Sequence, residues 1–311
     1  MKTITQSFLK VSKLHKIYFQ QFGSKDGTPI IFLHGGPGGK SEPKNLDYLP
    51  ENQSFNAVLF DQRGCGESKP FGEIKENTTL DLIEDIKKLA LHLKLEKFYL
   101  FGSSWGSTLA LLFAQKYPKR VKGLVLKSVF LARRKDIEWL YSENGAARFF
   151  PDKYKRVEEY LKQKRLTWKK FIDFAYKLIK SKKIEEQKEL VSIIYDVEYS
   201  LAKLDVPFHP LTKKDIDGNF LNTAKIYLHY LKNNFFLREN QILKEINKIK
   251  NIPTLIIHGR YDMLTPLEGA WKLHKALPKS RLFITNFSSH SLSWDGKVFL
   301  KEFLKKERLF K

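Results

Sequence analysis

Residues 98–117 read FYLFGSSWGSTLALLFAQKY, and this stretch decides the fold. Its first four residues form an apolar run typical of a buried strand, and Leu109–Tyr117 is typical of a helix. Between them, GSSWG at residues 102–106 fits the Gly-x-Ser-x-Gly pattern, in which a sharp turn from strand to helix projects the central hydroxyl. The two glycines remove side chains that would collide at the bend. Ser104 is therefore the expected nucleophile, and Ser103, which lies off-centre, is expected to pack within the turn.

Short apolar runs alternate with amphipathic segments on both sides of this turn. Residues 78–95 carry an apolar stripe at helical spacing, and Thr78 or Thr79 can cap the start of that helix. Alternation of this kind predicts βαβ units, so the expected fold class is α/β, with a mostly parallel central sheet flanked by helices. The expected strands span residues 15–22, 29–33, 57–60, 98–101, 121–129, 254–257 and 282–285, and the expected helices include 78–95, 109–117 and 269–277.

The pattern changes between residues 133 and 236, where strand-like runs give way to helical segments rich in aromatic residues and lysine. We therefore expect one catalytic core made of residues 1–132 and 237–311, interrupted by a helical domain at 133–236. Long insertions at the carboxyl edge of a parallel sheet usually cover the active site.

A serine hydroxyl needs a base, and the base needs a carboxylate that orients it. In a fold of this kind the acid and the histidine follow the nucleophile in that order, each after a later strand. Of the eight histidines, only His290 follows the last predicted strand on a polar loop, and Asp262 follows the strand before it. Asp61 precedes the nucleophile and Asp295 lies beyond the histidine, so neither fits this order. The expected triad is Ser104, Asp262 and His290.

Backbone N–H groups must also face the oxyanion of the tetrahedral intermediate. Trp105, the residue after the nucleophile, is expected to supply one donor. The second is expected from the loop HGGPGG that starts at His34, where we prefer Gly36 to Gly35. This loop lacks the Gly-Lys-Ser/Thr ending of a phosphate-binding loop. His34 and His258 each end a predicted strand before a glycine, which favours a structural role or support of the oxyanion site.

Composition narrows the class of protein. The chain has 311 residues, 42% hydrophobic and 14% aromatic, which supplies a sizeable core and excludes disorder. A single cysteine excludes an internal disulfide and a cysteine metal cluster. Residues 1–30 lack a signal-peptide pattern, and no apolar run approaches the ~20 residues of a membrane span, so we expect a cytoplasmic protein. Residues 151–190 hold 13 Lys/Arg and 7 Asp/Glu at helical spacing, so we attribute the net charge of +22 to solvated helix faces.

Together these motifs resemble the proline iminopeptidases (prolyl aminopeptidases) of the α/β-hydrolase superfamily. The resemblance covers nearly the whole chain and includes HGGPGG at 34–39, FDQRGCGES at 60–68, GSSWGSTLAL at 102–111, IPTLIIHGRYD at 252–262 and SSHS at 288–291. It implies an α/β-hydrolase core, a helical cap, and removal of N-terminal proline from small peptides without a metal or organic cofactor. It also implies that Phe130 and Tyr141 lie near the proline ring. Separately, we expect no nucleic-acid or membrane partner.

The chain departs from this family where the substrate amine is recognised. The family places a glutamate from each of two cap helices around the free imino group. Glu198 matches the first position, although both flanking tryptophans are replaced. In AKIYLHY, at residues 224–230, Tyr227 stands where the family has the second glutamate. Loss of one carboxylate from such a pair weakens cation binding by about 1–3 kcal/mol, and Asp196 and Glu239 are candidates to compensate.

Three functions follow from these observations. The first is a serine exopeptidase that releases N-terminal proline through a prolyl-enzyme intermediate. The second keeps the same triad in a diverged carboxylesterase or broader aminopeptidase, and Tyr227 motivates it. The third is a basic nucleic-acid-binding protein on a hydrolase fold. It predicts salt-dependent binding to DNA or RNA that survives Ser104→Ala, and the presence of all three triad residues counts against it.

Overall fold

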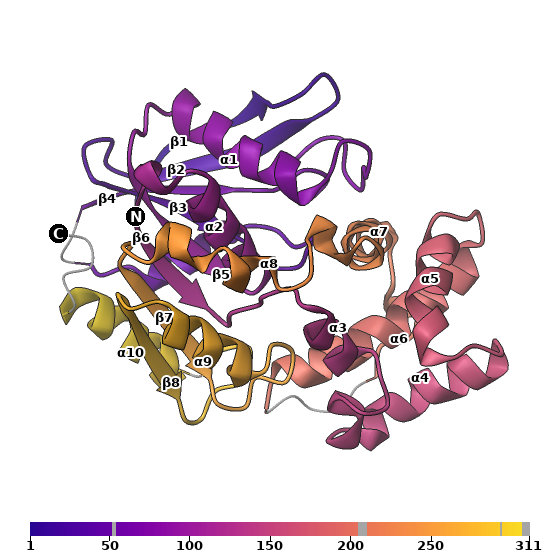
Figure 1. Ribbon diagram of the computed structural model, residues 1–311. Coiled ribbons are helices and arrows are strands. Elements are labelled where there is room, and N and C mark those ends of the chain that lie inside the picture. Colours follow the sequence, from indigo (N-terminus) through magenta and orange to yellow (C-terminus); the bar gives the residue numbers. More distant parts are fainter. Residues whose placement is uncertain (52–53, 205–209, 293, 307–311) are drawn as a thin grey trace.

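The computed structural model describes residues 1–51, 54–204, 210–292 and 294–306, and an eight-stranded sheet lies at its centre (Figure 1). The strand order is β1-β2-β4-β3-β5-β6-β7-β8. The pairs β1–β2 and β2–β4 are antiparallel and the other five are parallel, which confirms the predicted fold class. The strands are β1 (Thr3–Lys10), β2 (Lys16–Gly23), β3 (Thr28–Leu33), β4 (Phe55–Phe60), β5 (Phe98–Ser103), β6 (Val121–Lys127), β7 (Thr254–Gly259) and β8 (Ser280–Thr285).

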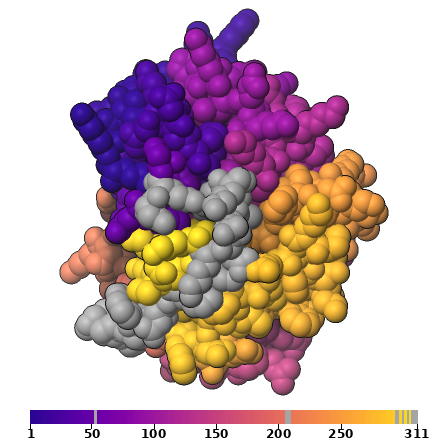
Figure 2. All heavy atoms as spheres, turned by 90° about the vertical axis from the view of Figure 1, so that its left-hand side faces the viewer, coloured from indigo at the N-terminus to yellow at the C-terminus, as the bar shows by residue number. Residues whose placement is uncertain are grey.

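Helices cover both faces of the sheet. Successive residues of β5 point to opposite faces, so Leu100 packs in a core with α1 (Thr79–His92) and α2 (Trp105–Lys116), together with α9 (Leu267–Ala276). Phe101 packs in the core on the other face, with Leu300 of α10 (Trp294–Lys306). Figure 2 shows this C-terminal segment, in yellow, beside the indigo and purple N-terminal part of the chain, where Lys301 pairs with Glu51. Covering of both faces explains why the central strands read as continuous apolar runs.

The observed elements differ from the expected ones in several places. The sequence pattern does not predict β1, because it is an edge strand in which no residue is buried and no apolar alternation is needed. The strand expected at 121–129 ends at Lys127, since Ser128 has φ +51° and leaves the extended conformation. Of the two threonines that can cap α1, Thr78 does so through a capping box with Asp81.

A helical lobe lies between β6 and β7, where the described residues contain no strand. In Figure 1, α4, α5 and α6 stand to one side of the sheet, and α7 lies nearer to it. Residues 205–209 of the expected insertion, and 307–311 of the expected core, lie outside the described residues. The α-helices of this segment are α3 (Arg134–Leu140), α4 (Pro151–Gln163), α5 (Trp168–Ile179), α6 (Ile184–Ala202), α7 (Gly218–Lys232) and α8 (Gln241–Lys244).

The basic segment 151–190 contributes α4, α5 and the start of α6. On α4 the apolar residues at helical spacing face inward, and the buried ones are Tyr154, Val157, Tyr160 and Leu161. No helix among the described residues is long and apolar enough to cross a lipid bilayer.

Candidate active site

Ser104 lies on a sharp turn between β5 and α2. Its backbone adopts φ +56° and ψ −124°, a conformation that costs a non-glycine residue about 1–3 kcal/mol. The flanking glycines are required by close backbone approach. A Cβ atom on Gly102 would lie 2.3 Å from the carbonyl oxygen of Gly106, and one on Gly106 would lie 1.9 Å from that of Leu33. The turn thus places Ser104 at the N-terminus of α2 and at the carboxyl edge of the sheet.

Asp262 and His290 meet beside this edge, although 28 residues separate them. Asp262 follows β7 and His290 follows β8, and His290 Nδ1 lies 3.0 and 2.9 Å from the two carboxylate oxygens of Asp262. Thr265 donates its N–H and its hydroxyl to the same carboxylate, each at 2.8 Å. Burial opposes ionisation of Asp262, but His290, His258 and these hydrogen bonds hold its pKa well below the usual range. Asp262 is therefore a charged acceptor that orients the imidazole ring of His290.

One cavity connects these residues to the helical lobe. Its volume is about 450 Å³, including the part open to solvent. Thr265, which contacts both Asp262 and His290, lies on its wall together with Ser104. Five of the residues predicted from sequence line this one space. The lining residues are Gly36, Ser104, Phe130, Asp136, Ile137, Leu140, Glu198, Tyr227, Leu231, Phe235, Leu264 and Thr265.

The backbone at Gly36 and Trp105 suits an oxyanion site. Gly36 has φ +121°, and a Cβ atom there would lie 2.6 Å from the nitrogens of Gly38 and Gly39. Gly36, and not Gly35, lines the cavity beside Ser104. Trp105 is the first residue of α2, and such N–H groups have no acceptor within their own helix. Among the described residues, no hydrogen-bond acceptor is found for the N–H of either Gly36 or Trp105.

Gln62 supports this site, and sequence reasoning did not single it out. Its backbone N–H donates to His34 Nε2 at 3.0 Å, and its side-chain oxygen accepts from Trp105 Nε1 at 3.0 Å. Burial lowers the pKa of His34, so its ring is a neutral acceptor. The corresponding histidine at the end of β7, His258, accepts from the Val129 N–H and contacts the Thr265 carbonyl. Both histidines therefore brace loops beside the site. The signal for Gln62 is its place in the FDQRGCGES motif.

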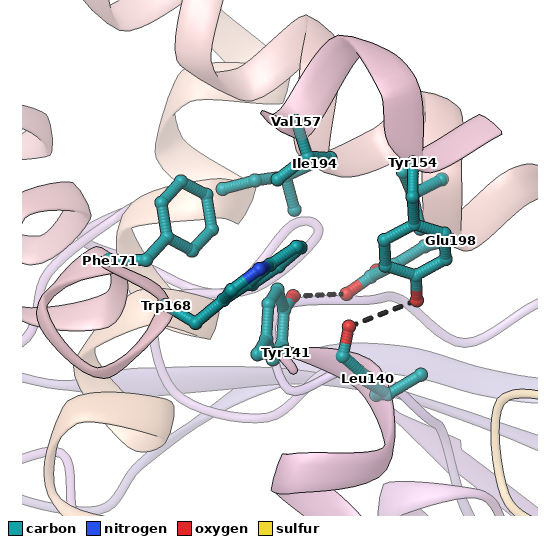
Figure 3. A pocket seen from close by; sticks show the side chains of 9 residues that line it. Leu140, Tyr141, Tyr154, Val157, Trp168, Phe171, Ile194 and Glu198 are labelled. Carbon is teal, nitrogen blue, oxygen red and sulfur yellow. Dashed lines mark hydrogen bonds between the residues drawn. The ribbon is translucent and has the colours of Figure 1, made fainter. Parts of the chain in front are cut away.

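Glu198 of α6 places a carboxylate on the cavity wall. Its side chain and that of Tyr141 point toward one another, and the Tyr141 hydroxyl donates to Glu198 Oε1 at 2.9 Å (Figure 3). The hydroxyl of Tyr227, on α7, lies 2.9 Å from that of Tyr141 and also hydrogen-bonds Glu198. Apolar side chains enclose the far side of this cluster, among them Trp168 and Ile194.

The surroundings of Glu198, Tyr141 and Tyr227 determine which of these side chains carries a proton. Burial raises the pKa of Glu198, and hydrogen bonds from Tyr227 and Tyr141 lower it in part. Burial also raises the pKa values of both tyrosines well above the usual range, so they remain protonated donors. A cation that enters the cavity would favour the ionised form of Glu198, because an opposite charge stabilises a carboxylate.

Neither candidate for a compensating carboxylate lies in the cavity. Asp196 accepts from the Leu211 N–H at 3.1 Å, and Glu239 accepts from the Arg134 N–H at 2.9 Å. The second carboxylate on the wall is Asp136, which pairs with Arg133 at 2.6 Å. Among the described residues there is no cluster of three or more His, Cys, Asp or Glu that could hold a metal ion.

Comparison with known proteins shows the family to which this fold belongs. Residues 28–297 match the family described as α/β hydrolase fold. A proline iminopeptidase of Arabidopsis thaliana is 40% identical over 289 residues, which cover 93% of this chain and 75% of that protein. A probable proline iminopeptidase of Leptolyngbya boryana is 40% identical over 290 residues, which cover 93% and 89%.

Solved structures show the same fold at lower identity. An esterase from Exiguobacterium antarcticum is 20% identical with a TM-score of 0.65, and the match covers 97% of this chain and 99% of that one. A proline iminopeptidase-related protein from Thermus thermophilus is 20% identical with a TM-score of 0.60, and the match covers 98% of each chain. At this identity the likeness concerns the fold alone.

Proposed function

The chain belongs to the proline iminopeptidase family of α/β hydrolases, and from this premise we propose that it releases N-terminal proline from small peptides. One observation carries the proposal. A single cavity holds the turn serine at one wall and a half-buried carboxylate, Glu198, at another. A hydrolase that acts only at a chain end needs both features, because it must attack the carbonyl and bind the free imino group of the same residue.

The proposed chemistry is acyl transfer through Ser104. His290 takes the hydroxyl proton as Oγ attacks the prolyl carbonyl, and Asp262 holds the ring in the required orientation. The N–H groups of Gly36 and Trp105 stabilise the oxyanion, where one donor is worth about 3–4 kcal/mol. His290 then protonates the leaving amine, and the C–N bond breaks to give a prolyl-enzyme. Water hydrolyses this ester by the reverse sequence of proton transfers.

The helical lobe supplies the recognition of the chain end. We assign residues 133–236 as the cap domain and residues 1–132 and 237–311 as the core. Glu198 binds the cationic imino group, with Tyr141 and Tyr227 fixing its carboxylate. Phe130, on the wall of the same cavity, is the proposed contact for the pyrrolidine ring. In this proposal the lobe blocks the space beyond the imino group, which restricts cleavage to N-terminal positions.

A second candidate keeps the triad but changes the substrate. Tyr227 occupies the place of the family's second glutamate, so one carboxylate remains to bind a cation. A diverged carboxylesterase or broader aminopeptidase would tolerate this change, because neither requires two carboxylates around a proline nitrogen.

Three substrates separate these candidates. Hydrolysis is compared for prolyl-β-naphthylamide, its N-acetylated form and a p-nitrophenyl ester, with Ser104→Ala as the control. Preferential turnover of the free prolyl amide, lost in the variant, supports the aminopeptidase. Turnover of the ester alone moves the function to an esterase, and turnover of none contradicts the proposed triad.

A further inference from the structure

Lys127 is a buried lysine that the reaction described above does not use. It is the last residue of β6, and its side chain is almost fully enclosed, with the residue 7% exposed. Its Nζ atom donates to the His290 carbonyl oxygen at 3.0 Å and to Ser103 Oγ at 3.3 Å. These two partners are the proposed base itself and the residue that precedes the nucleophile. The ammonium therefore bridges the two loops that must face each other during catalysis.

The sheet brings Lys127 to this position. β6 lies between β5 and β7, and Lys127 is in register with Ser103 on one side and Ile257 on the other. The backbone carbonyl of Lys127 also accepts the N–H of Ser104 at 3.0 Å. The nucleophile turn is thus held by the main chain of Lys127, while the side chain of the same residue holds the main chain of His290.

Ser128 reinforces the contact with His290. Its hydroxyl donates to the same His290 carbonyl at 3.0 Å. Successive side chains of a strand point to opposite faces, so two neighbours cannot both reach one acceptor in an extended chain. The positive φ of Ser128, +51°, turns the chain and allows it. Strained conformations of this kind are kept where the surrounding structure requires them.

We propose that Lys127 is a positioning residue that holds the backbone of His290 against the nucleophile turn. Asp262 orients the ring through Nδ1, and Lys127 with Ser128 fixes the main chain to which the ring is attached, so the base is held at both ends. This inference rests on the proposed function in that it takes Ser104 and His290 as nucleophile and base.

The surroundings of Lys127 disfavour its charged form. Burial lowers its pKa to about 8, Asp262 acts in the opposite direction, and Lys297 of α10 lowers it further. The charge of Lys127 in turn helps to lower the pKa of His258, which burial lowers most. The fold therefore disfavours the ammonium form, and the His290 carbonyl keeps the Ser128 hydroxyl as a donor when Lys127 is replaced, so Lys127→Met separates positioning from folding.

The test compares Lys127→Met and Lys127→Arg with Lys122→Met, a control on the exposed face of the same strand. A misplaced base costs about 10- to 100-fold in rate, so we expect kcat of Lys127→Met to fall by that factor with KM nearly unchanged. We expect its thermal unfolding midpoint to stay or rise, Lys127→Arg to recover most of the loss, and Lys122→Met to match the wild type. A kcat for Lys127→Met within about twofold of the wild type would overturn the inference, as would a loss that Arg does not recover.

Labelling by phenylmethylsulfonyl fluoride separates this inference from the proposed function. In that reaction Ser104 Oγ attacks sulfur, fluoride leaves and His290 accepts the proton, so prolyl recognition is not needed. Slower labelling of Lys127→Met than of the wild type supports the inference, and equal rates overturn it whatever the natural substrate is. If the wild type is not labelled, the proposed function fails as well.

If Lys127→Met does not fold, the pH dependence of kcat in the wild type and in Lys127→Arg tests the inference. Wild-type kcat should fall as pH rises through about 8, where Lys127 loses its proton. Arginine stays charged, so the fall should move to higher pH in Lys127→Arg. Identical alkaline limbs in the two proteins would overturn the inference.

Discussion

Substitution of Glu198 by glutamine tests how the proposed enzyme recognises a chain end. The change keeps the size of the side chain and removes its negative charge. Of the two carboxylates that line the cavity, Asp136 is already neutralised by Arg133, whereas Glu198 has only tyrosine hydroxyls as partners among the described residues. Removing one partner of a buried charge pair costs about 2–5 kcal/mol of binding free energy. Because the cavity is partly open to solvent, which screens charges, we expect a loss of about 2–4 kcal/mol for Glu198→Gln. At 1.36 kcal/mol per factor of ten, this corresponds to a loss of about 30- to 900-fold in kcat/KM.

The assay measures kcat/KM for prolyl-β-naphthylamide and for p-nitrophenyl acetate near neutral pH. Only the first substrate carries a cationic nitrogen, so we expect the loss on the amide and an ester rate close to that of the wild type. Glu185→Gln is the matched control, because Glu185 lies on the same helix α6 but is exposed to solvent.

Two results would refute the reasoning. An amide kcat/KM within about threefold of the wild type would show that Glu198 does not bind the imino group. An equal loss on both substrates would show that the carboxylate supports the catalytic residues or the fold instead of the substrate amine.

Three further predictions follow from the same structure. Tyr227→Phe removes a hydrogen-bond donor to Glu198 and should therefore raise the pKa of Glu198. The acid limb of the pH profile of kcat/KM for prolyl amide should then move to higher pH. An unchanged acid limb would contradict the hydrogen bond. Asp262 has a depressed pKa, so its contribution to the free energy of unfolding is complete above about pH 4 and is lost as pH falls further. The free energy of unfolding of Asp262→Asn, measured in urea, should therefore depend less on pH in the acid range. The kcat of this variant should fall about 10⁴-fold. Gly106→Ala places a Cβ atom 1.9 Å from the Leu33 carbonyl and should destabilise the fold by about 3 kcal/mol or more. Gly218→Ala, whose Cβ atom would have nothing within 4 Å, should unfold at or above the wild-type temperature. Similar thermal unfolding midpoints for the two variants would count against the turn geometry.

Much of the core was predictable because its signals are local. An apolar run followed by Gly-x-Ser-x-Gly and a helix has few conformations that avoid backbone collisions, and the contacts of Gly102 and Gly106 show why. Asp262 and His290 were predictable because each follows a strand after Ser104, and the carboxyl ends of parallel strands share one edge. The edge strand β1 escaped prediction because an exposed strand has no burial pattern to read.

The partners of buried polar groups were not predictable in the same way. Lys127 ends a run that reads as a buried strand, yet nothing local shows that its ammonium reaches His290, 163 residues away. Asp196 and Glu198 lie on one helix two residues apart, and only the packing of α6 against α7 shows which of them faces the cavity. Gln62 likewise contacts His34 and Trp105 only after three loops have met.

The sequence by itself determined the fold class, the nucleophile turn and the order of the candidate triad, because these depend on backbone sterics and on burial along single elements. Tertiary structure alone decided that Tyr141 and Tyr227 hold Glu198 and that Lys127 joins the nucleophile turn to His290. Those contacts join segments far apart in the chain, and they depend on how helices and strands pack. The periodicity of apolar residues indicates which face of a helix or strand is buried. It does not indicate which polar group of another element lies opposite that face.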